Sequence, residues 1–195
     1  MKVLHYITLF TLLLTVKGYA QQGGGKGPVV HFGGKFGGTL TKTTAPDIEG
    51  KRKWGYQVGG YVTVDLVPNL GIQGEALYNR NVFLLVTPEN TDKQKTIVKT
   101  WNFPVLLRLN AGEAFTFNIG PQFSHVISSR GYQPEGRSGT FDKSHVSFVT
   151  GIELGSRNTG GRLYARYNWN NKDFSGVVKD AKANQFQFGL LLPIL

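Results

Sequence analysis

Hydrophobic and polar residues alternate along most of the chain, in segments of roughly ten residues separated by turn residues. In one such segment, 54–66, the even positions are mostly apolar, from Trp54 to Leu66, and the odd positions include Gln57 and Asp65. Side chains two apart in a strand lie on the same face, so the segment has one apolar and one polar face. The pattern occurs in eight segments: 30–41, 54–66, 70–79, 101–110, 115–124, 145–154, 163–169 and 185–194.

Long and short connections alternate between these segments. The short ones are 67–69, 111–113 and 158–160. The long ones are 43–53, 86–95, 128–143 and 171–183. Barrels of the bacterial outer membrane have short periplasmic turns and longer external loops. The sequence therefore predicts an all-β fold, an eight-stranded antiparallel up-and-down transmembrane β-barrel, with both termini in the periplasm and the long loops outside the cell.

The apolar face carries an aromatic residue near the long-loop end of most segments, and mainly aliphatic residues near the short turns. These aromatic residues are Trp54, Tyr78, Trp101, Phe123, Phe148, Trp169 and Phe186. Aromatic rings collect at the bilayer interface because they are large and apolar, and Trp and Tyr also have a polar edge. We therefore predict an aromatic girdle at one depth. The alternative, a soluble sandwich or lipocalin-like barrel, would turn its aromatic residues inward.

The N-terminal residues have the features of a secretory signal peptide. Lys2 precedes an apolar run from Val3 to Val16, and Gly18-Tyr19-Ala20 provides the small residues of a cleavage site. The alternative is an uncleaved anchor, but the run is shorter than the about 20 residues that a membrane-spanning helix needs. We expect residues 1–20 to be a cleaved signal peptide, 21–28 a flexible Gly-rich leader and 29–195 the barrel.

Composition agrees with a membrane barrel and excludes other classes. The chain of 195 residues has 26 Gly, no Cys and 17% charged residues. Without Cys there is no disulfide framework, and His31 and His125 have no partners at metal-ligand spacing, so we expect neither a metal nor a cofactor. The Gly-rich leader lacks the spacing of a phosphate-binding loop. The formal net charge is +10, but we do not expect nucleic acid as the partner of an exported barrel.

Six charged residues fall on the polar face, which would line the barrel lumen, with three of each sign. They are Lys35, Asp65, Glu75, Arg108, Glu153 and Arg166. An eight-stranded barrel is just wide enough for its own side chains, and buried charges are costly unless they are paired. We therefore expect an ion-pair network that fills the lumen. The alternative is a polar channel.

The remaining positive charge is expected outside the lumen, near strand ends. It includes Lys26, Lys42, Arg80, Lys99, Arg157 and Arg162. Phosphate groups of lipopolysaccharide would be suitable neighbours, and a solvated basic surface is the alternative. In the third long loop, Tyr132, Pro134 and Phe141 form a candidate contact surface for another outer-membrane or periplasmic protein.

An enzyme is the alternative from a different class of function. His145 and Ser147 lie two apart on one strand face and resemble the His-x-Ser pair of lipid A deacylases. Glu153, the candidate orienting acid, is about 20 Å from Ser147 along the same strand, which is too far for a hydrogen bond. The pair is also expected to face the lumen rather than lipid. We therefore expect no catalytic residues and no enzymatic activity.

Several segments resemble one family. The segment Trp101-Asn102-Phe103-Pro104-Val105-Leu106-Leu107-Arg108 is similar to the aromatic-x-x-Ile-Pro-Leu-Leu-Leu-Lys strand of the Bacteroidetes outer-membrane β-barrel family that is often called PorT-like. Segments 73–78, 117–122 and 161–167 are further matches. The resemblance implies an eight-stranded outer-membrane barrel without catalytic residues, and one branch of the family is an accessory in type IX protein secretion. Family barrels commonly end on an aromatic residue, whereas this chain ends on Leu192-Pro193-Ile194-Leu195.

These observations together predict a non-enzymatic protein of the bacterial outer membrane. Its lumen is expected to be filled by side chains, and its role to be structural or accessory to envelope or secretion machinery. A small channel or a lipid A-modifying barrel enzyme is the alternative.

Overall fold

The computed structural model describes residues 28–45, 48–49, 53–87, 90–130, 144–156, 160–170 and 182–194. The regular secondary structure in these ranges consists of strands. They are β1 (Val29–Ala45), β2 (Ile48–Glu49), β3 (Lys53–Val67), β4 (Leu70–Thr87), β5 (Asn90–Ala111), β6 (Phe115–Arg130), β7 (Ser144–Leu154), β8 (Arg162–Trp169) and β9 (Lys182–Pro193). Residues 1–27 lie outside the described residues, so the signal peptide and the leader stay predictions.

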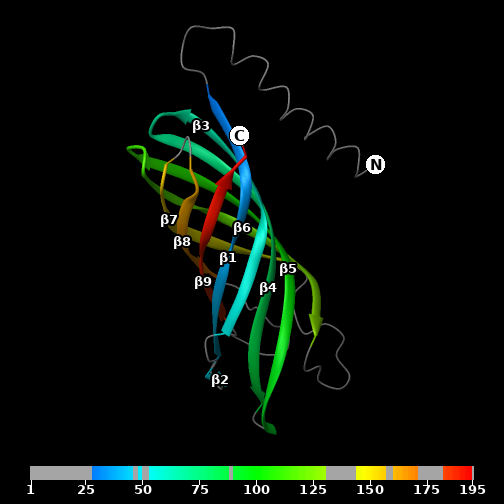
Figure 1. Cartoon of the computed structure of the whole chain (residues 1–195). Coiled ribbons are helices and arrows are strands. Elements are labelled where there is room, and N and C mark those ends of the chain that lie inside the picture. The colour runs from blue at the N-terminus through cyan, green and yellow to red at the C-terminus, as the bar shows by residue number, and fades with distance from the viewer. Residues whose placement is uncertain are drawn as a thin grey trace.

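The long strands form a closed barrel. Each pairs antiparallel with the next along the chain, and β9 returns to pair with β1 (Figure 1). Leu40 of β1, for example, pairs with Trp54 of β3 on one side and with Phe186 of β9 on the other. The short β2 pairs with the end of β1, so eight strands make the wall. The predicted fold class, an eight-stranded antiparallel up-and-down barrel, is confirmed.

The seam between β1 and β9 joins residues far apart in the sequence. Gly37 and Gly189 are partners there, and a Cβ atom on Gly37 would lie 2.2 Å from the hydroxyl oxygen of Tyr164. Glycine at this position therefore makes room for a large side chain inside the barrel. The pairing continues to the end of β9, where the amide of Ile194 donates to the carbonyl oxygen of Phe32 at 2.9 Å.

The connections follow the predicted alternation with one correction. Pro68-Asn69 forms a tight turn, and Gly112 begins another with a φ of 68°, which glycine adopts without steric cost. The expectation of a long loop at 86–95 is wrong, because β4 and β5 continue as a hairpin in which Thr87 pairs with Asn90. The run Val82-Phe83-Leu84-Leu85-Val86 does not alternate, yet its branched and aromatic residues favour a strand. Most of the other three long connections lie outside the described residues.

The barrel has a polar interior and an apolar exterior. In β5, Trp101 and Leu107 are 40% and 42% exposed, whereas Asn102 and Arg108 are 3% and 4% exposed. Among the described residues, 25 buried side chains are polar or charged and seven are hydrophobic. A soluble barrel has the opposite arrangement, so this distribution fits a wall that contacts lipid. None of the described residues forms a helix long and apolar enough to cross a membrane.

Candidate functional site

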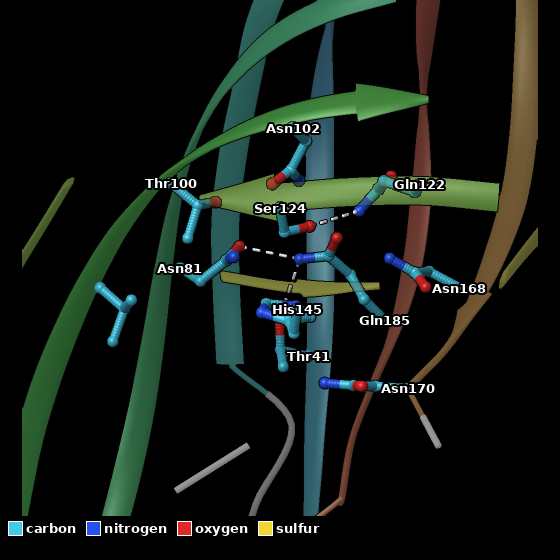
Figure 2. Close-up of a pocket in the computed structure, with 11 residues that line it drawn as sticks. Thr41, Asn81, Thr100, Asn102, Gln122, Ser124, His145, Asn168, Asn170 and Gln185 are labelled. Atoms are coloured by element: carbon cyan, nitrogen blue, oxygen red, sulfur yellow. Dashed lines mark hydrogen bonds between the residues drawn. The ribbon is translucent and has the colours of Figure 1, made fainter. Parts of the chain in front are cut away.

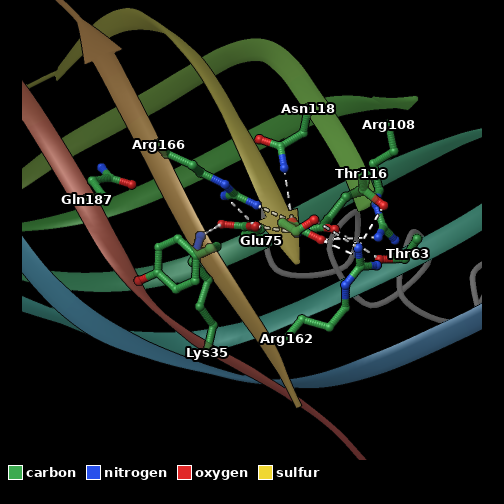
Figure 3. A network of polar contacts seen from close by, with 12 residues as sticks. Lys35, Thr63, Glu75, Arg108, Thr116, Asn118, Arg162, Arg166 and Gln187 are labelled. Carbon is green, nitrogen blue, oxygen red and sulfur yellow. Dashed lines mark hydrogen bonds and ion pairs between the residues drawn. The ribbon is translucent and has the colours of Figure 1, made fainter. Parts of the chain in front are cut away.

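The centre of the lumen is occupied by the guanidinium group of Arg166. This residue of β8 makes two ion pairs, from Nη1 to Glu75 Oε1 at 2.7 Å and from Nη2 to Glu153 Oε1 at 2.8 Å (Figure 3). Glu75 lies on β4 and Glu153 on β7. In the closed order of the eight long strands, β4 and β8 stand on opposite walls. The pair between Arg166 and Glu75 therefore crosses the barrel.

Glu75 has further partners on its own side of the lumen. Lys35 of β1 donates to Glu75 Oε2 at 2.8 Å, and Gln73 donates to Oε1. The Lys35 ammonium also lies 4.2 Å from the ring centroid of Tyr164, a cation–π contact. The Tyr164 hydroxyl accepts a hydrogen bond of 2.6 Å from Gln57. Glu75 is thus held by charged and neutral donors from several strands.

Glu153 collects a second set of donors nearer the short turns. Arg108 of β5 lies 3.1 Å from Glu153 Oε2, and Arg162 of β8 lies 3.7 Å from the same oxygen. Asn118 donates to Glu153 Oε1 at 3.0 Å. Arg162 also donates to Thr116 Oγ1 at 2.8 Å. Both carboxylates therefore accept several bonds, as buried carboxylates require.

Five of the six predicted lumen charges meet in this network, and Asp65 does not. Asp65 lies near the short turns, with Oδ2 at 3.6 Å from Nε2 of His31 and Oδ1 at 3.3 Å from Nδ2 of Asn110. The placement of Arg162 outside the lumen is wrong, because its side chain is buried and paired with Glu153. Arg162 lies two residues before Tyr164 on the same strand, so the alternation that places Tyr164 inside also places Arg162 there.

The network is consequently not balanced in charge. Two carboxylates accept bonds from four cations, which are Lys35, Arg108, Arg162 and Arg166. The expected equality of three positive and three negative charges is therefore wrong for the described lumen residues. Moving one strand would leave a buried charge without its partner, which is costly.

The half of the lumen towards the long connections has a different lining. A small recess there has a cavity volume of about 30 Å³, and neutral polar side chains dominate its walls (Figure 2). Thr100, Asn102, Gln122 and Asn168 are at least 93% buried, and each has one oxygen atom with no hydrogen-bond partner among the described residues. The sequence pattern places Asn102, Gln122 and Asn168 on the polar face, but the predicted segment 101–110 begins after Thr100, and the pattern does not identify the recess.

The candidate catalytic pair lies near this recess. His145 lines it, and Ser147 is buried, with its hydroxyl 3.5 Å from the carbonyl oxygen of Gln122. Glu153, the imagined third member, is bound by three arginines and Asn118 at the other end of the lumen. The described residues also contain no group of three or more His, Cys, Asp or Glu side chains that could hold a metal.

The seven predicted girdle residues lie on the outer wall. Six of them are 39% to 65% exposed and Tyr78 is half-buried. Tyr78 pairs with Trp101 across β4 and β5, with ring centroids 5.9 Å apart, and Phe148 pairs with Trp169 across β7 and β8, at 6.5 Å. Neighbouring aromatic side chains therefore form contacts along the long-connection side of the barrel.

The fold is that of the outer-membrane β-barrels. Three solved structures are similar along 85% or 86% of this chain and at least 96% of their own. Ail of Yersinia pestis has a TM-score of 0.52 at 11% identity. The neisserial surface protein A has a TM-score of 0.51 at 13% identity, covering 85% of this chain and 98% of its own. OprG of Pseudomonas aeruginosa has a TM-score of 0.52 at 12% identity, covering 86% of this chain and 96% of its own.

Comparison of the sequence with known proteins does not identify a family for this chain. No protein-family model matches the chain, and no curated protein matches it. A second structure of Ail was solved in complex with sucrose octasulfate, a heparin analogue. At these identities the likeness establishes the fold of the chain.

Proposed function

We propose that this protein is a non-enzymatic barrel of the bacterial outer membrane whose lumen is closed to solutes. The pair between Arg166 and Glu75, 2.7 Å long and formed between opposite walls, carries this proposal. A solute would have to break buried ion pairs to pass, and each break would leave an uncompensated charge. In this proposal the termini are periplasmic and the long connections face outside.

If the lumen is closed, the outer wall and the long loops are the surfaces that can contact other molecules. The proposed role is structural, or accessory to envelope or secretion machinery. The resemblance to the PorT-like family supports a link to type IX secretion. The loop with Tyr132, Pro134 and Phe141, which lies outside the described residues, is the proposed contact for another envelope protein.

Lipopolysaccharide is the proposed lipid partner of the outer wall. The formal net charge of the whole chain is +10, and it stays positive when the predicted signal peptide, with Lys2 and Lys17, is removed, which favours contact with phosphate groups. Ail, which shares the fold, was crystallised with a polyanionic sugar sulfate, and this is a further reason to test polyanions here.

Planar-bilayer recording tests the closed lumen. The purified wild-type barrel is expected to give no steady single-channel conductance. An Arg166→Gly/Tyr164→Gly variant removes the two large side chains at the centre and is the positive control, with folding checked by circular dichroism. Steady conductance from the wild type would contradict the proposal.

A small channel is the second candidate. The recess in the long-connection half has room for about one water molecule, and its unpartnered oxygen atoms favour entry of water or a similarly small polar solute from that side. The same recordings distinguish the two candidates. A lipid A-modifying activity is tested separately, since the mass profile of lipid A from cells with and without the protein should be identical if the barrel is not an enzyme.

Mild-detergent extraction from native outer membranes tests the accessory role. A stoichiometric partner identified by mass spectrometry would support it, and its loss after deletion of residues 131–141 would assign the contact to that loop. A lone monomer would instead favour a purely structural barrel.

A further inference from the structure

Two cations stand opposite each other on the outer wall. Arg80 of β4 and Lys99 of β5 are direct partners in the antiparallel register. Their neighbours Asn79 and Thr100 are buried on the lumen side, so alternation directs Arg80 and Lys99 outward. Both side chains are half-buried rather than fully exposed.

This arrangement is unfavourable without an anion. Partners across antiparallel strands have Cβ atoms about 5 Å apart, and like charges at such positions destabilise a sheet. Among the described residues, no carboxylate forms an ion pair with Arg80 or Lys99. The acidic residues whose side chains the structure describes are Asp65, Glu75, Glu113 and Glu153, which belong to the lumen or to a short turn. Glu49 and Asp92 lie on described strands, but their side chains are outside the described part of the chain. A negative group from outside the described chain would therefore relieve the repulsion.

The pair lies at the depth where a lipid headgroup would be expected. Arg80 and Lys99 are two residues beyond Tyr78 and Trp101, which pair with each other in the girdle. Tyr56, 47% exposed on the outer wall, pairs with Arg80 from β3 and adds a hydroxyl group to the same row. The row thus combines an edge-to-face aromatic pair, two cations and a hydroxyl donor in the order in which acyl chains give way to phosphates.

We propose that Arg80 and Lys99 form a binding site for a phosphate group of lipid A, the membrane anchor of lipopolysaccharide, with Tyr56 as an additional donor. Guanidinium and ammonium groups bind phosphate through charge-assisted hydrogen bonds, and two of them can share one phosphate. The site rests on the proposed function in one respect, since it requires the long connections to face the leaflet that contains lipopolysaccharide.

Other cations at the same end provide a matched control. Lys42 lies on the outer wall of β1 opposite Asn184, and so has no cation as its direct partner on β9. Lys53 lies on β3 on the face that alternation directs to the lumen. Replacing these two removes as much charge as replacing Arg80 and Lys99, but from opposite faces of the sheet.

Native mass spectrometry of the detergent-purified barrel tests the site. The probes are bisphosphorylated lipid A, lipid A stripped of both phosphates, and inorganic phosphate as a competitor. We expect the wild type to bind the bisphosphorylated form, and Arg80→Gln/Lys99→Gln to weaken this binding at least about tenfold. Lys42→Gln/Lys53→Gln is expected to change it less than about twofold.

Three results would overturn the proposal. They are equal binding of lipid A with and without phosphates, equal weakening by both double variants, and displacement by inorganic phosphate at the concentration at which lipid A itself binds. The last result would mean that the site binds a free phosphate ion rather than the phosphate group of a lipid. Urea unfolding of each variant establishes that the barrel is folded. Conductance is measured in parallel, because an open lumen would contradict the proposed function without affecting the lipid site.

Discussion

The two halves of the lumen stabilise their polar side chains in different ways. Towards the short turns, cations from β1, β5 and β8 converge on Glu75 and Glu153, and their side chains meet across the barrel. Towards the long connections, neutral amides and hydroxyls line the walls around a recess of about 30 Å³, and several of their oxygen atoms have no partner among the described residues. A recess of similar size, about 20 Å³, lies beside Arg108, Glu153 and Arg162, so the halves differ in charge rather than in open volume.

The difference follows from the cost of burial. An uncompensated charge inside a protein costs several kcal/mol, so charged side chains must reach their partners even across the lumen. A buried amide or hydroxyl without a partner costs about 1–3 kcal/mol, which a barrel can tolerate at a few positions. The ion pairs that cross the lumen are therefore concentrated in the charged half.

Breaking the centre of the charged half should have the largest effect. Arg166→Met removes the guanidinium group that joins Glu75 and Glu153, and we expect a loss of about 3–5 kcal/mol in the free energy of unfolding. Urea unfolding in lipid vesicles, followed by tryptophan fluorescence, measures it. Asn168→Leu, on the same strand and face but in the neutral half, should cost less than about 1 kcal/mol. Equal losses would remove the distinction between the halves.

Overfilling the charged half should have a smaller effect. A Cβ atom on Gly151 would lie 2.3 Å from Cγ of Arg166, so Gly151→Val should displace the arginine and cost about 1–3 kcal/mol. The control is Gly74→Val, because nothing lies within 4 Å of a Cβ atom at Gly74. The same unfolding measurement applies. A Gly151 variant as stable as the Gly74 variant would mean that the network can rearrange.

Replacing a threonine by valine in each half compares the two halves with the same chemical change. Thr116 in the charged half donates to Asn110 and accepts from Arg162, so Thr116→Val should cost about 1–2 kcal/mol. The hydroxyl of Thr100 in the neutral half has no partner among the described residues, so Thr100→Val should be neutral or slightly stabilising. The difference between the two free energies of unfolding is the measurement. A destabilising Thr100→Val would show that the recess depends on that hydroxyl.

Ionic strength should distinguish the buried charges of the lumen network from the exposed cations of the lipid site. Of the changes considered, it should have the smallest effect on the free energy of unfolding. Raising the ionic strength from about 0.05 M to about 0.5 M should change the free energy of unfolding by less than about 1 kcal/mol, because buried pairs are poorly screened. Binding of lipid A at Arg80 and Lys99 should weaken several-fold over the same range. A stability that falls as steeply as the binding would mean that water and ions reach the network.

Most of the fold could be predicted from the sequence because alternation records which face each side chain takes. It predicted all eight wall strands and the inward positions of Lys35, Glu75 and Arg108. It failed in the β4–β5 hairpin, where the run from Val82 to Val86 has no polar face to mark a strand. The same alternation, extended from Tyr164 to the first residue of β8, places Arg162 inside.

The partners inside the lumen could not be predicted in the same way. Glu75 and Arg166 are separated by 91 positions and belong to strands that are not paired with each other. Their contact depends on the number of strands and on the stagger around the barrel, which no local pattern encodes. For the same reason the sequence could not identify which amides in the neutral half would be left without partners.

The seam between β1 and β9 bears on how the barrel is assembled. Its register runs from Gly33 with Pro193 to Thr44 with Lys182. The sheet therefore keeps a free edge until the first and last strands of the wall pair. Until then, unpaired amides and carbonyls would face hydrocarbon at several kcal/mol each. A chain cut short before β9 would therefore be expected to stall at the membrane surface as an open sheet, exposed to proteases and to pairing with other chains. Integrity of the final strand thus determines whether any of the chain can be inserted.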